Sequence, residues 1–535
     1  MQKKYIKISL WLLFYLIIAL VLLVNSYNYM DADLGWHLMV GNEIIQDGNV
    51  PHVNCYNYTI KSENWVDHEW LMNLIMALIF NSLGYLSLTL FFVLIIIATL
   101  ILQNIFIKKF FSNKALIYVA LIQLFGIYAM RPHLGIRVQE ISLLMITLLF
   151  FIIFTYEKNN KIKYLPWLVP LFYLWSNMHG SFLIGFFIIG LWIGLDIVLA
   201  IYKWFKYKKL SHPRKLLVLL FFTFLSFVST LLTPYKTELY SFLLGYRDSF
   251  YLTHIEEWLP IFYIPINYWK ISYLAVFTGL LILIFIDKKK IVDLSIKESR
   301  KNNIKKIPLW FWFLNAFFFV MSIKSKRHFP LFFVSSIPLM FSMAIYLFGI
   351  PKIFNKNKFL IPKYIIIFLL FLALIVFQAN KLKVTNNPFD SYCKENPCGA
   401  VKFLKENDQY KNLRLFNLYG WGGYLIWAWP GKELFIDGRL PQFSYNGHTM
   451  LAEYYEFMDK EKIEQKLDEH EIEMLLIKSK YLPIKLNWFE KHILLLNQEK
   501  LNDNKYHLRE YLDANEAWES VFDDGISVVY VKNNL

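Results

Sequence analysis

Long apolar runs separated by short polar stretches dominate residues 1–380. A helix needs about 20 apolar residues to cross a bilayer. Candidate crossings lie at about residues 8–25, 86–107, 115–130, 138–156, 165–178, 181–204, 215–233, 271–286, 307–323, 329–349 and 360–379. The apolar stretch 69–84 is short and follows a polar loop, so we interpret it as an interfacial or re-entrant helix. The pattern predicts a polytopic α-helical membrane protein with about eleven transmembrane helices.

The chain changes character after residue 380 and becomes polar, with the periodicity of short strands and helices. Predicted strands lie at 413–418, 433–437, 472–477 and 527–531, and a predicted helix lies at 453–470. A segment of about 150 residues is long enough to bury a core of its own. We therefore predict a transmembrane domain at 1–380, with its first outer loop at 26–85, and a soluble α/β domain at 381–535.

Composition agrees with this picture. The 535 residues are 56% hydrophobic and 19% aromatic, and their mean hydropathy is +0.37. The formal net charge of +15 is typical of nucleic-acid binders in soluble proteins, but here the lysines lie in short loops between apolar runs. Such a bias is typical of cytoplasmic loops, so we exclude nucleic acid as a partner.

The basic loops also give the chain an orientation. They lie at residues 3–7, 108–114, 158–163, 203–215, 288–306 and 352–358. With eleven crossings, all of them fall on one side, which the positive-inside rule makes cytoplasmic. The N-terminus is then cytoplasmic and the C-terminal domain extracytoplasmic, in a protein of the plasma membrane. Cys393 and Cys398 are able to pair in that compartment, although their spacing leaves the bond open.

Unusual polar residues collect near helix ends on the predicted outer side. These are Asp31, Asp33 and His37; His68 and Glu69; Arg131, His133 and Arg137; Asn177 and His179; Glu256 and Glu257; and Lys324, Lys326, Arg327 and His328. Ionisable groups at membrane depth are costly and usually mark a site. Taken singly, each has an alternative role as an interfacial anchor, a helix cap or part of a loop. Because the clusters share one side, we predict that they meet in one outward-facing polar cavity.

This mixture suits transfer from a phosphorylated lipid. A carboxylate is able to accept a proton from an acceptor hydroxyl, and cationic side chains stabilise a departing phosphate. The Asp31-x-Asp33 spacing also offers oxygen ligands to Mg²⁺ or Mn²⁺. As a motif the spacing is weak, so a metal stays an open alternative and no cofactor is required.

The stretch Asp31–Pro51 carries a family resemblance. Two acids directly after the first helix, followed by an interfacial helix that stops at Gly48, resemble the GT-C superfamily of membrane glycosyltransferases, which includes the oligosaccharyltransferase catalytic subunit and the protein O-mannosyltransferases. The resemblance implies a sugar donor on polyprenyl phosphate, an inverting reaction and an outward-facing site. The tail lacks the Trp-Trp-Asp signature of oligosaccharyltransferases, and Trp421-Gly-Gly is not its equivalent, so transfer to an asparagine sequon is not supported.

The resemblance also implies roles for individual residues. It makes Asp33 the favoured catalytic carboxylate and Asp31 a second acid or metal ligand. Further residues are expected to bind substrate or its phosphate: His37, His68, Glu69, Arg131, His133, Asn177, His179, Arg327 and His328. The acceptor is a cell-envelope glycan, lipid or protein.

Two other functions remain alternatives. A transporter or flippase for a lipid-linked or anionic solute predicts polar residues along a path at mid-depth, often with inverted repeats. A non-catalytic membrane scaffold predicts that the outer acids are replaceable.

Overall fold

The computed structural model describes residues 2–113, 115–208, 213–245, 249–287, 307–348, 387–439, 443–502 and 507–533. Within these residues the chain is mainly helical, with a small sheet near its C-terminus. It forms two compact units. The first unit holds residues 1–27, 86–236 and 257–384, and the second holds residues 28–85, 237–256 and 385–535. The predicted crossing at 360–379 lies outside the described residues.

Helices of the first unit coincide with the predicted apolar runs. They are α1 (Gln2–Asn28), α3 (Trp70–Phe110), α4 (Ile117–Met130), α5 (Glu140–Asn159), α6 (Leu168–Met178), α7 (Phe182–Tyr207), α8 (Pro213–Thr230), α11 (Tyr268–Asp287), α13 (Leu309–Lys324) and α14 (Phe329–Phe348). Every predicted run before residue 350 lies on one of them. Gly84 breaks α3 with a φ of 77°, a conformation that glycine adopts without strain. This break separates the stretch 69–84 from the run 86–107.

Six helices in the described part of the chain are long and apolar enough to cross a membrane, and α13 is a shorter apolar helix. The chain is therefore an integral membrane protein. The count of eleven crossings and their orientation stay predictions.

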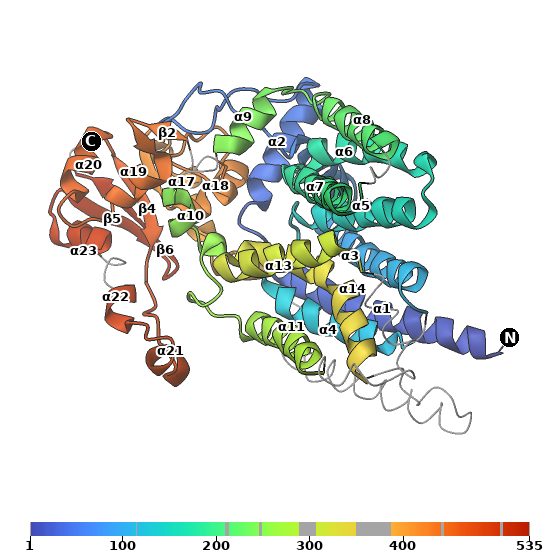
Figure 1. The fold of residues 1–535 in the computed structure, drawn as a ribbon. Helices are drawn as coiled ribbons and strands as arrows, with labels where there is room; N and C mark the ends of the chain where they lie inside the picture. The colour runs from blue at the N-terminus through green and yellow to red at the C-terminus, as the bar shows by residue number, and fades with distance from the viewer. Residues whose placement is uncertain are drawn as a thin grey trace. The chain divides into compact units, whose positions relative to one another are not determined.

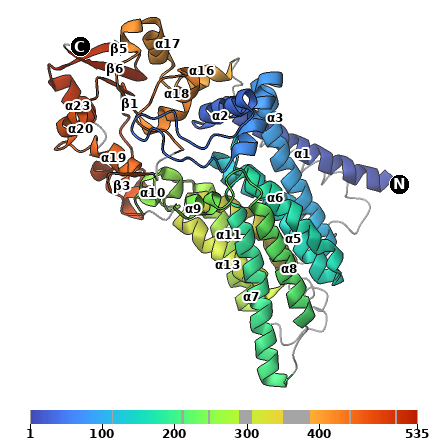
Figure 2. The same cartoon turned by 90° about the horizontal axis from the view of Figure 1, so that it is seen from above.

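Neighbouring helices of the first unit pack through aromatic side chains. Helix α14 contacts both α13 and α4, and α11 contacts both α4 and α14 (Figure 1). Helix α6 contacts both α5 and α8, and Figure 2 shows these helices of the unit from above. Among the buried side chains of the unit, the ring centres of Phe106 and Phe154 lie 4.9 Å apart, and those of Phe154 and Phe311 lie 5.4 Å apart. Edge-to-face contacts of this kind add to the apolar burial of each ring.

The second unit is built around a four-stranded sheet in the order β1-β4-β6-β5. Its strands are β1 (Leu415–Asn417), β4 (Met474–Lys478), β5 (Trp518–Asp523) and β6 (Ser527–Lys532). β1 pairs with β4 in parallel, and the other pairs are antiparallel. β4 and β6 consist of nearly continuous apolar runs and are buried, as central strands covered on both faces are. A short hairpin of β2 (Ser444–Tyr445) and β3 (His448–Thr449) lies outside this sheet.

Short helices complete the second unit. They are α2 (Leu34–Asp47), α9 (Glu238–Gly245), α10 (Ser249–His254), α16 (Pro388–Tyr392), α17 (Cys398–Glu406), α18 (Gly422–Ala428), α19 (Met450–Glu456), α20 (Ile463–Glu469), α21 (Trp488–His492), α22 (Gln498–Asn502) and α23 (His507–Ala514). The interfacial helix predicted before Gly48 is α2, whose cap is Gly48 in the left-handed conformation. A disulfide joins Cys393 to Cys398.

Two local expectations for the tail need correction, and one strand was missed. The predicted strand at 433–437 contributes only an isolated bridge, from Leu434 to Asn57. The predicted helix at 453–470 is two helices, α19 and α20, with turns between them. Strand β5 had no sequence prediction, because Glu519 and Ser520 interrupt its apolar residues.

Helix α2 crosses α18 at very short distance. A Cβ at Gly35 would lie 2.2 Å from the carbonyl oxygen of Gly423, and a Cβ at Gly423 would lie 2.4 Å from that of Ala32. Since real Cβ atoms do not approach backbone so closely, only glycine permits this crossing. The polar loop after the first helix is thus packed tightly onto the C-terminal segment.

We predict that Gly423→Ala separates α2 from α18 and lowers the stability of the second unit by about 1–3 kcal/mol, as overpacking does. Thermal denaturation of the purified protein measures the effect. Gly420→Ala is the matched control, because nothing lies within 4 Å of a Cβ at Gly420. Equal melting temperatures for the two variants would contradict the prediction.

Candidate functional site

The two acids of the first polar loop lie at the start of α2. Asp31 accepts a hydrogen bond from the backbone N–H of Asp33, at 3.0 Å. Asp33 is the N-cap residue of α2, yet its side chain makes no capping hydrogen bond. Its carboxylate instead lies over Gly438, where a Cβ would be 2.4 Å from Oδ1. Both acids are partly exposed, so each remains accessible to a substrate.

Arg439, the residue after Gly438, is buried and ties the first polar loop to the C-terminal segment. Its guanidinium donates to both oxygens of Asp437, at 2.9 and 2.8 Å. The same group donates to the side-chain oxygens of Asn54 at 3.1 Å and Asn57 at 3.2 Å. A bidentate pair of this kind fixes geometry as well as charge.

Aromatic rings and backbone bonds complete this contact. The Arg439 guanidinium lies 4.4 Å from the ring centre of Tyr56 and 4.6 Å from that of Trp65. The backbone N–H of Leu434 donates to the carbonyl oxygen of Tyr56 at 2.8 Å, and the carbonyl oxygen of Leu434 accepts from the N–H of Tyr58 at 3.2 Å. We call this set of contacts the Arg439 clamp. It fixes residues 54–65, whereas Gly438 and Gly423 fix Asp33.

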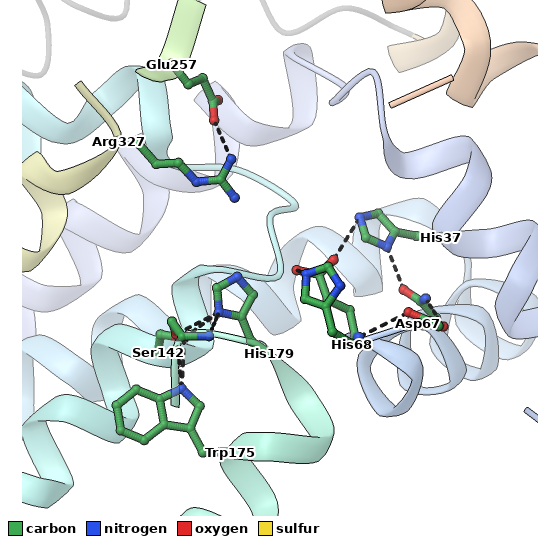
Figure 3. A network of polar contacts seen from close by, with 11 residues as sticks. His37, Asp67, His68, Ser142, Trp175, His179, Glu257 and Arg327 are labelled. Carbon is green, nitrogen blue, oxygen red and sulfur yellow. Dashed lines mark hydrogen bonds and ion pairs between the residues drawn. The ribbon is translucent and has the colours of Figure 1, made fainter. Parts of the chain in front are cut away.

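A network of polar side chains, separate from the Arg439 clamp, links α2 to the start of α3 (Figure 3). His37 Nδ1 lies 2.6 Å from the side-chain oxygen of Asn73, whose amide donates to Asp67 at 2.7 Å. Since that oxygen only accepts, His37 carries its proton on Nδ1. Burial lowers the pKa of His37 to about 4 and raises that of Asp67 to about 7. His37 is therefore neutral at pH 7.

Glu69 lies between two of the predicted site histidines. Its carboxylate is 3.6 Å from His68 Nε2 and 4.0 Å from His37 Nε2. This polar network therefore extends from Asp67 through His37 toward Glu69 and His68. Of the predicted residues, the second unit thus groups His37, His68 and Glu69, and it also holds Asp31 and Asp33.

Among the described residues, Glu453, Glu469 and His470 form the one group with metal-ligand spacing. Lys466 already supplies a cation there, with its Nζ at 2.9 Å from Glu453 and 3.0 Å from Glu469. His470 Nε2 bonds to Glu453 at 2.7 Å. These contacts are those of a buried ion-pair network rather than of a metal centre. Asp31 and Asp33 belong to no such group in the described part of the chain.

In the first unit, basic side chains surround the single carboxylate of Glu257. Arg137 forms a hydrogen-bonded ion pair with Glu257, and Arg327 lies 3.6 Å from it (Figure 3). Burial alone raises the pKa of Glu257, but the charges of Arg137 and Arg327 outweigh it and lower the pKa to about 2. Trp258 stacks on the Arg327 guanidinium at 5.0 Å and contacts the His328 ring at 5.6 Å.

His133 lies within the same group of charges. Its Nε2 accepts a hydrogen bond from the buried ammonium of Lys270. Burial lowers its pKa well below the ordinary value, and the charge of Lys270 lowers it further. Arg137, Lys270 and Arg327 therefore face a neutral histidine and one carboxylate. We call this the cationic cluster, and its surplus positive charge favours an anion.

The remaining predicted residues make contacts within the helix turns of the first unit. His179 Nδ1 lies 3.0 Å from the hydroxyl of Ser142, to which Trp175 donates at 3.1 Å (Figure 3). Asn177 donates to the carbonyl of Tyr173 at 2.8 Å, and Arg131 donates to Asn25 at 2.5 Å. The single cavity predicted for all clusters stays a prediction.

Sequence reasoning did not assign a site role to Arg137, Glu257 or Lys270. Arg137 and Glu257 did stand out as polar residues at helix ends. Lys270 had a detectable signal too, as a lysine at the start of an apolar run. The partners of Arg439 were not detectable, because Asn54 precedes it by 385 residues.

Several solved structures resemble the chain, among them two membrane proteins. The apo crystal structure of the Archaeoglobus fulgidus oligosaccharyltransferase aligns with 89% of this chain and 70% of its own, at a TM-score of 0.52 and 11% identity. The structure of ArnT from Cupriavidus metallidurans bound to undecaprenyl phosphate covers 97% of both chains, at a TM-score of 0.47 and 11% identity. No family model and no curated protein sequence matches the chain. The likeness to the oligosaccharyltransferase confirms the GT-C-like fold predicted from the sequence.

The raised pKa of Asp67 predicts a pH dependence of stability. The folded chain holds this proton more tightly than the unfolded chain, so the stability it adds is present in acid and lost as the pH rises through about 7. Asp67→Asn removes the titration. Raising the pH from 6 to 8 should lower the melting temperature of the wild type more than that of Asp67→Asn.

Asp47→Asn is the control, because Asp47 is exposed on the same loop, and it should follow the wild type. Parallel pH profiles for the wild type and Asp67→Asn would show that Asp67 does not titrate near neutrality.

Proposed function

We propose that the protein is an inverting membrane glycosyltransferase that transfers a sugar from a polyprenyl-phosphate donor. The acceptor is a cell-envelope glycan, lipid or protein on the extracytoplasmic side. One observation carries the proposal: the Asp33 carboxylate follows the first helix, is partly exposed and lies against Gly438 without capping its own helix. A carboxylate that is positioned against backbone and stays partly exposed is suited to act on a substrate.

In this proposal Asp33 acts as the base. It takes the proton of the acceptor hydroxyl as that oxygen bonds to the anomeric carbon of the donor. The bond from that carbon to the phosphate oxygen breaks, and the polyprenyl phosphate leaves with the electron pair. Attack from the opposite face inverts the anomeric centre. Asp31, which bonds to the backbone of Asp33, orients it, or binds Mg²⁺ or Mn²⁺ together with it.

The cationic cluster is assigned to the phosphate of the donor. Arginine suits this task because its planar guanidinium offers two parallel donors to phosphate oxygens. Arg327 is only partly covered, whereas Arg137 is engaged by Glu257. Arg327 is therefore the group that meets the phosphate, and Arg137 and Lys270 supply supporting charge.

Two observations support the extracytoplasmic side. Lysine-rich loops fall on the opposite side of the predicted crossings. The disulfide between Cys393 and Cys398 belongs to the second unit, and such bonds persist in oxidising compartments.

Asp33→Asn tests the catalytic assignment. In cells that lack the gene, complementation with this variant should leave the glycosylated envelope product about 10²–10⁴-fold below wild type, because the general base is lost. Mass spectrometry of envelope glycans and polyprenyl-linked sugars measures the product. Asp47→Asn on the same helix is the control and should restore it. Full product with Asp33→Asn, in a protein that reaches the membrane, would favour transport or scaffolding instead.

Arg327→Gln tests the phosphate assignment. Loss of a charged hydrogen bond should raise the KM for the lipid donor about 10–100-fold, with a smaller change in kcat, and Arg327→Lys should recover part of the loss. Lys215→Gln is the control, since Lys215 pairs with Asp196 at 3.1 Å at the predicted cytoplasmic end. An unchanged KM in Arg327→Gln, measured with purified protein, would refute the role.

A further inference from the structure

One segment of the second unit exposes large apolar side chains to an unusual degree. Between Tyr481 and Leu496, the exposed fractions are 87% for Leu482, 69% for Trp488, 54% for Ile493 and 81% for Leu495. We call residues 481–496 the apolar finger. A protein surface rarely leaves four such side chains uncovered within one short segment, and patches of this kind mark interaction sites.

Specific hydrogen bonds hold the apolar finger in its conformation. Asn487 and Glu490 form a capping box at α21, in which each side chain accepts from the other's backbone, at 3.0 and 2.8 Å. Asn502 closes the base, accepting from the backbone of Ile484 at 2.8 Å and donating to it at 3.2 Å. Figure 1 shows α21 and α22 projecting away from the sheet of their unit. The chain therefore holds these apolar side chains outward by specific bonds.

The charges around the finger select its partner. Lys480, Lys485, Lys491 and Lys500 are all exposed, whereas the nearest acid, Glu490, is buried in the capping box. Residues 478–500 hold five lysines against two glutamates. Tryptophan and leucine flanked by lysine suit the interface of an anionic bilayer, where the ring sits among headgroups and the ammonium groups meet phosphate.

We propose that the apolar finger inserts into the headgroup region of an anionic bilayer. The chain carries apolar helices long enough to span a membrane, so lipid is part of its surroundings. A second copy of the chain would have to bring lysines against lysines, which disfavours a self-contact. The finger thereby anchors the C-terminal unit to lipid, a role that does not depend on sugar transfer.

Site-directed spin labelling of the full-length protein in nanodiscs tests this inference. The background carries Cys55→Ser, because Cys55 is an exposed free cysteine, and retains the native disulfide. A nitroxide is placed by Leu495→Cys in one sample and by Leu482→Cys in another. Glu461→Cys, an exposed position before α20, is the control. Collision with oxygen and with a water-soluble nickel complex reports depth.

The measured quantity is the ratio of the collision rate with oxygen to the collision rate with nickel. In nanodiscs that contain phosphatidylglycerol, this ratio should be at least about threefold higher for the labels at 482 and 495 than for the label at 461. Lys485→Glu with Lys491→Glu should reduce this ratio. Water-like accessibility at all three positions would overturn the proposal. So would spin–spin broadening that disappears on dilution with unlabelled protein, since it would identify a second copy as the partner.

Discussion

A buried arginine–carboxylate pair holds the second unit together at its centre. Arg439 and Asp437 are nearly inaccessible, with exposed side-chain fractions of 1% and 0%. The Nη2 group of Arg439 also donates to Asn54 and Asn57, in the loop that follows the first helix. Removing one partner of such a pair leaves an uncompensated buried charge and costs about 3–5 kcal/mol. The loop and the C-terminal segment are therefore one folded unit, although most of the chain separates them in sequence.

The candidate catalytic carboxylate depends on the same joining of the loop to the C-terminal segment. Asp33 is positioned by its own helix and by two C-terminal glycines, so the C-terminal segment contributes to the candidate catalytic carboxylate directly. In the first unit, Arg137 and Arg327 lie beside Glu257, and their positive charge is suited to binding an anion. A base held by glycine contacts and an anion site made of arginines serve different tasks, and each uses the local structure suited to it.

The sequence predicted the elements whose signals are local. Apolar runs located the long helices, Gly48 ended α2, and β4 and β6 followed from continuous apolar stretches. Leu434 did not behave as a strand residue, because its partner is a loop residue, Asn57. The clamp itself was beyond local reasoning: Asp437-Gly-Arg439 has the appearance of a turn, and only the fold brings Asn54 and Trp65 to it.

The most direct measurement compares Arg439→Met with Arg509→Met in full-length protein, following hydrogen exchange of residues 28–69 and sugar transfer together. Arg509, on α23, pairs with the exposed acid Asp513 at 3.3 Å and serves as the control. The account predicts faster exchange at 54–65 and a loss of transfer in Arg439→Met, with both close to wild type in Arg509→Met. Undiminished transfer from a chain whose loop exchanges freely would contradict the claim that the C-terminal segment positions Asp33.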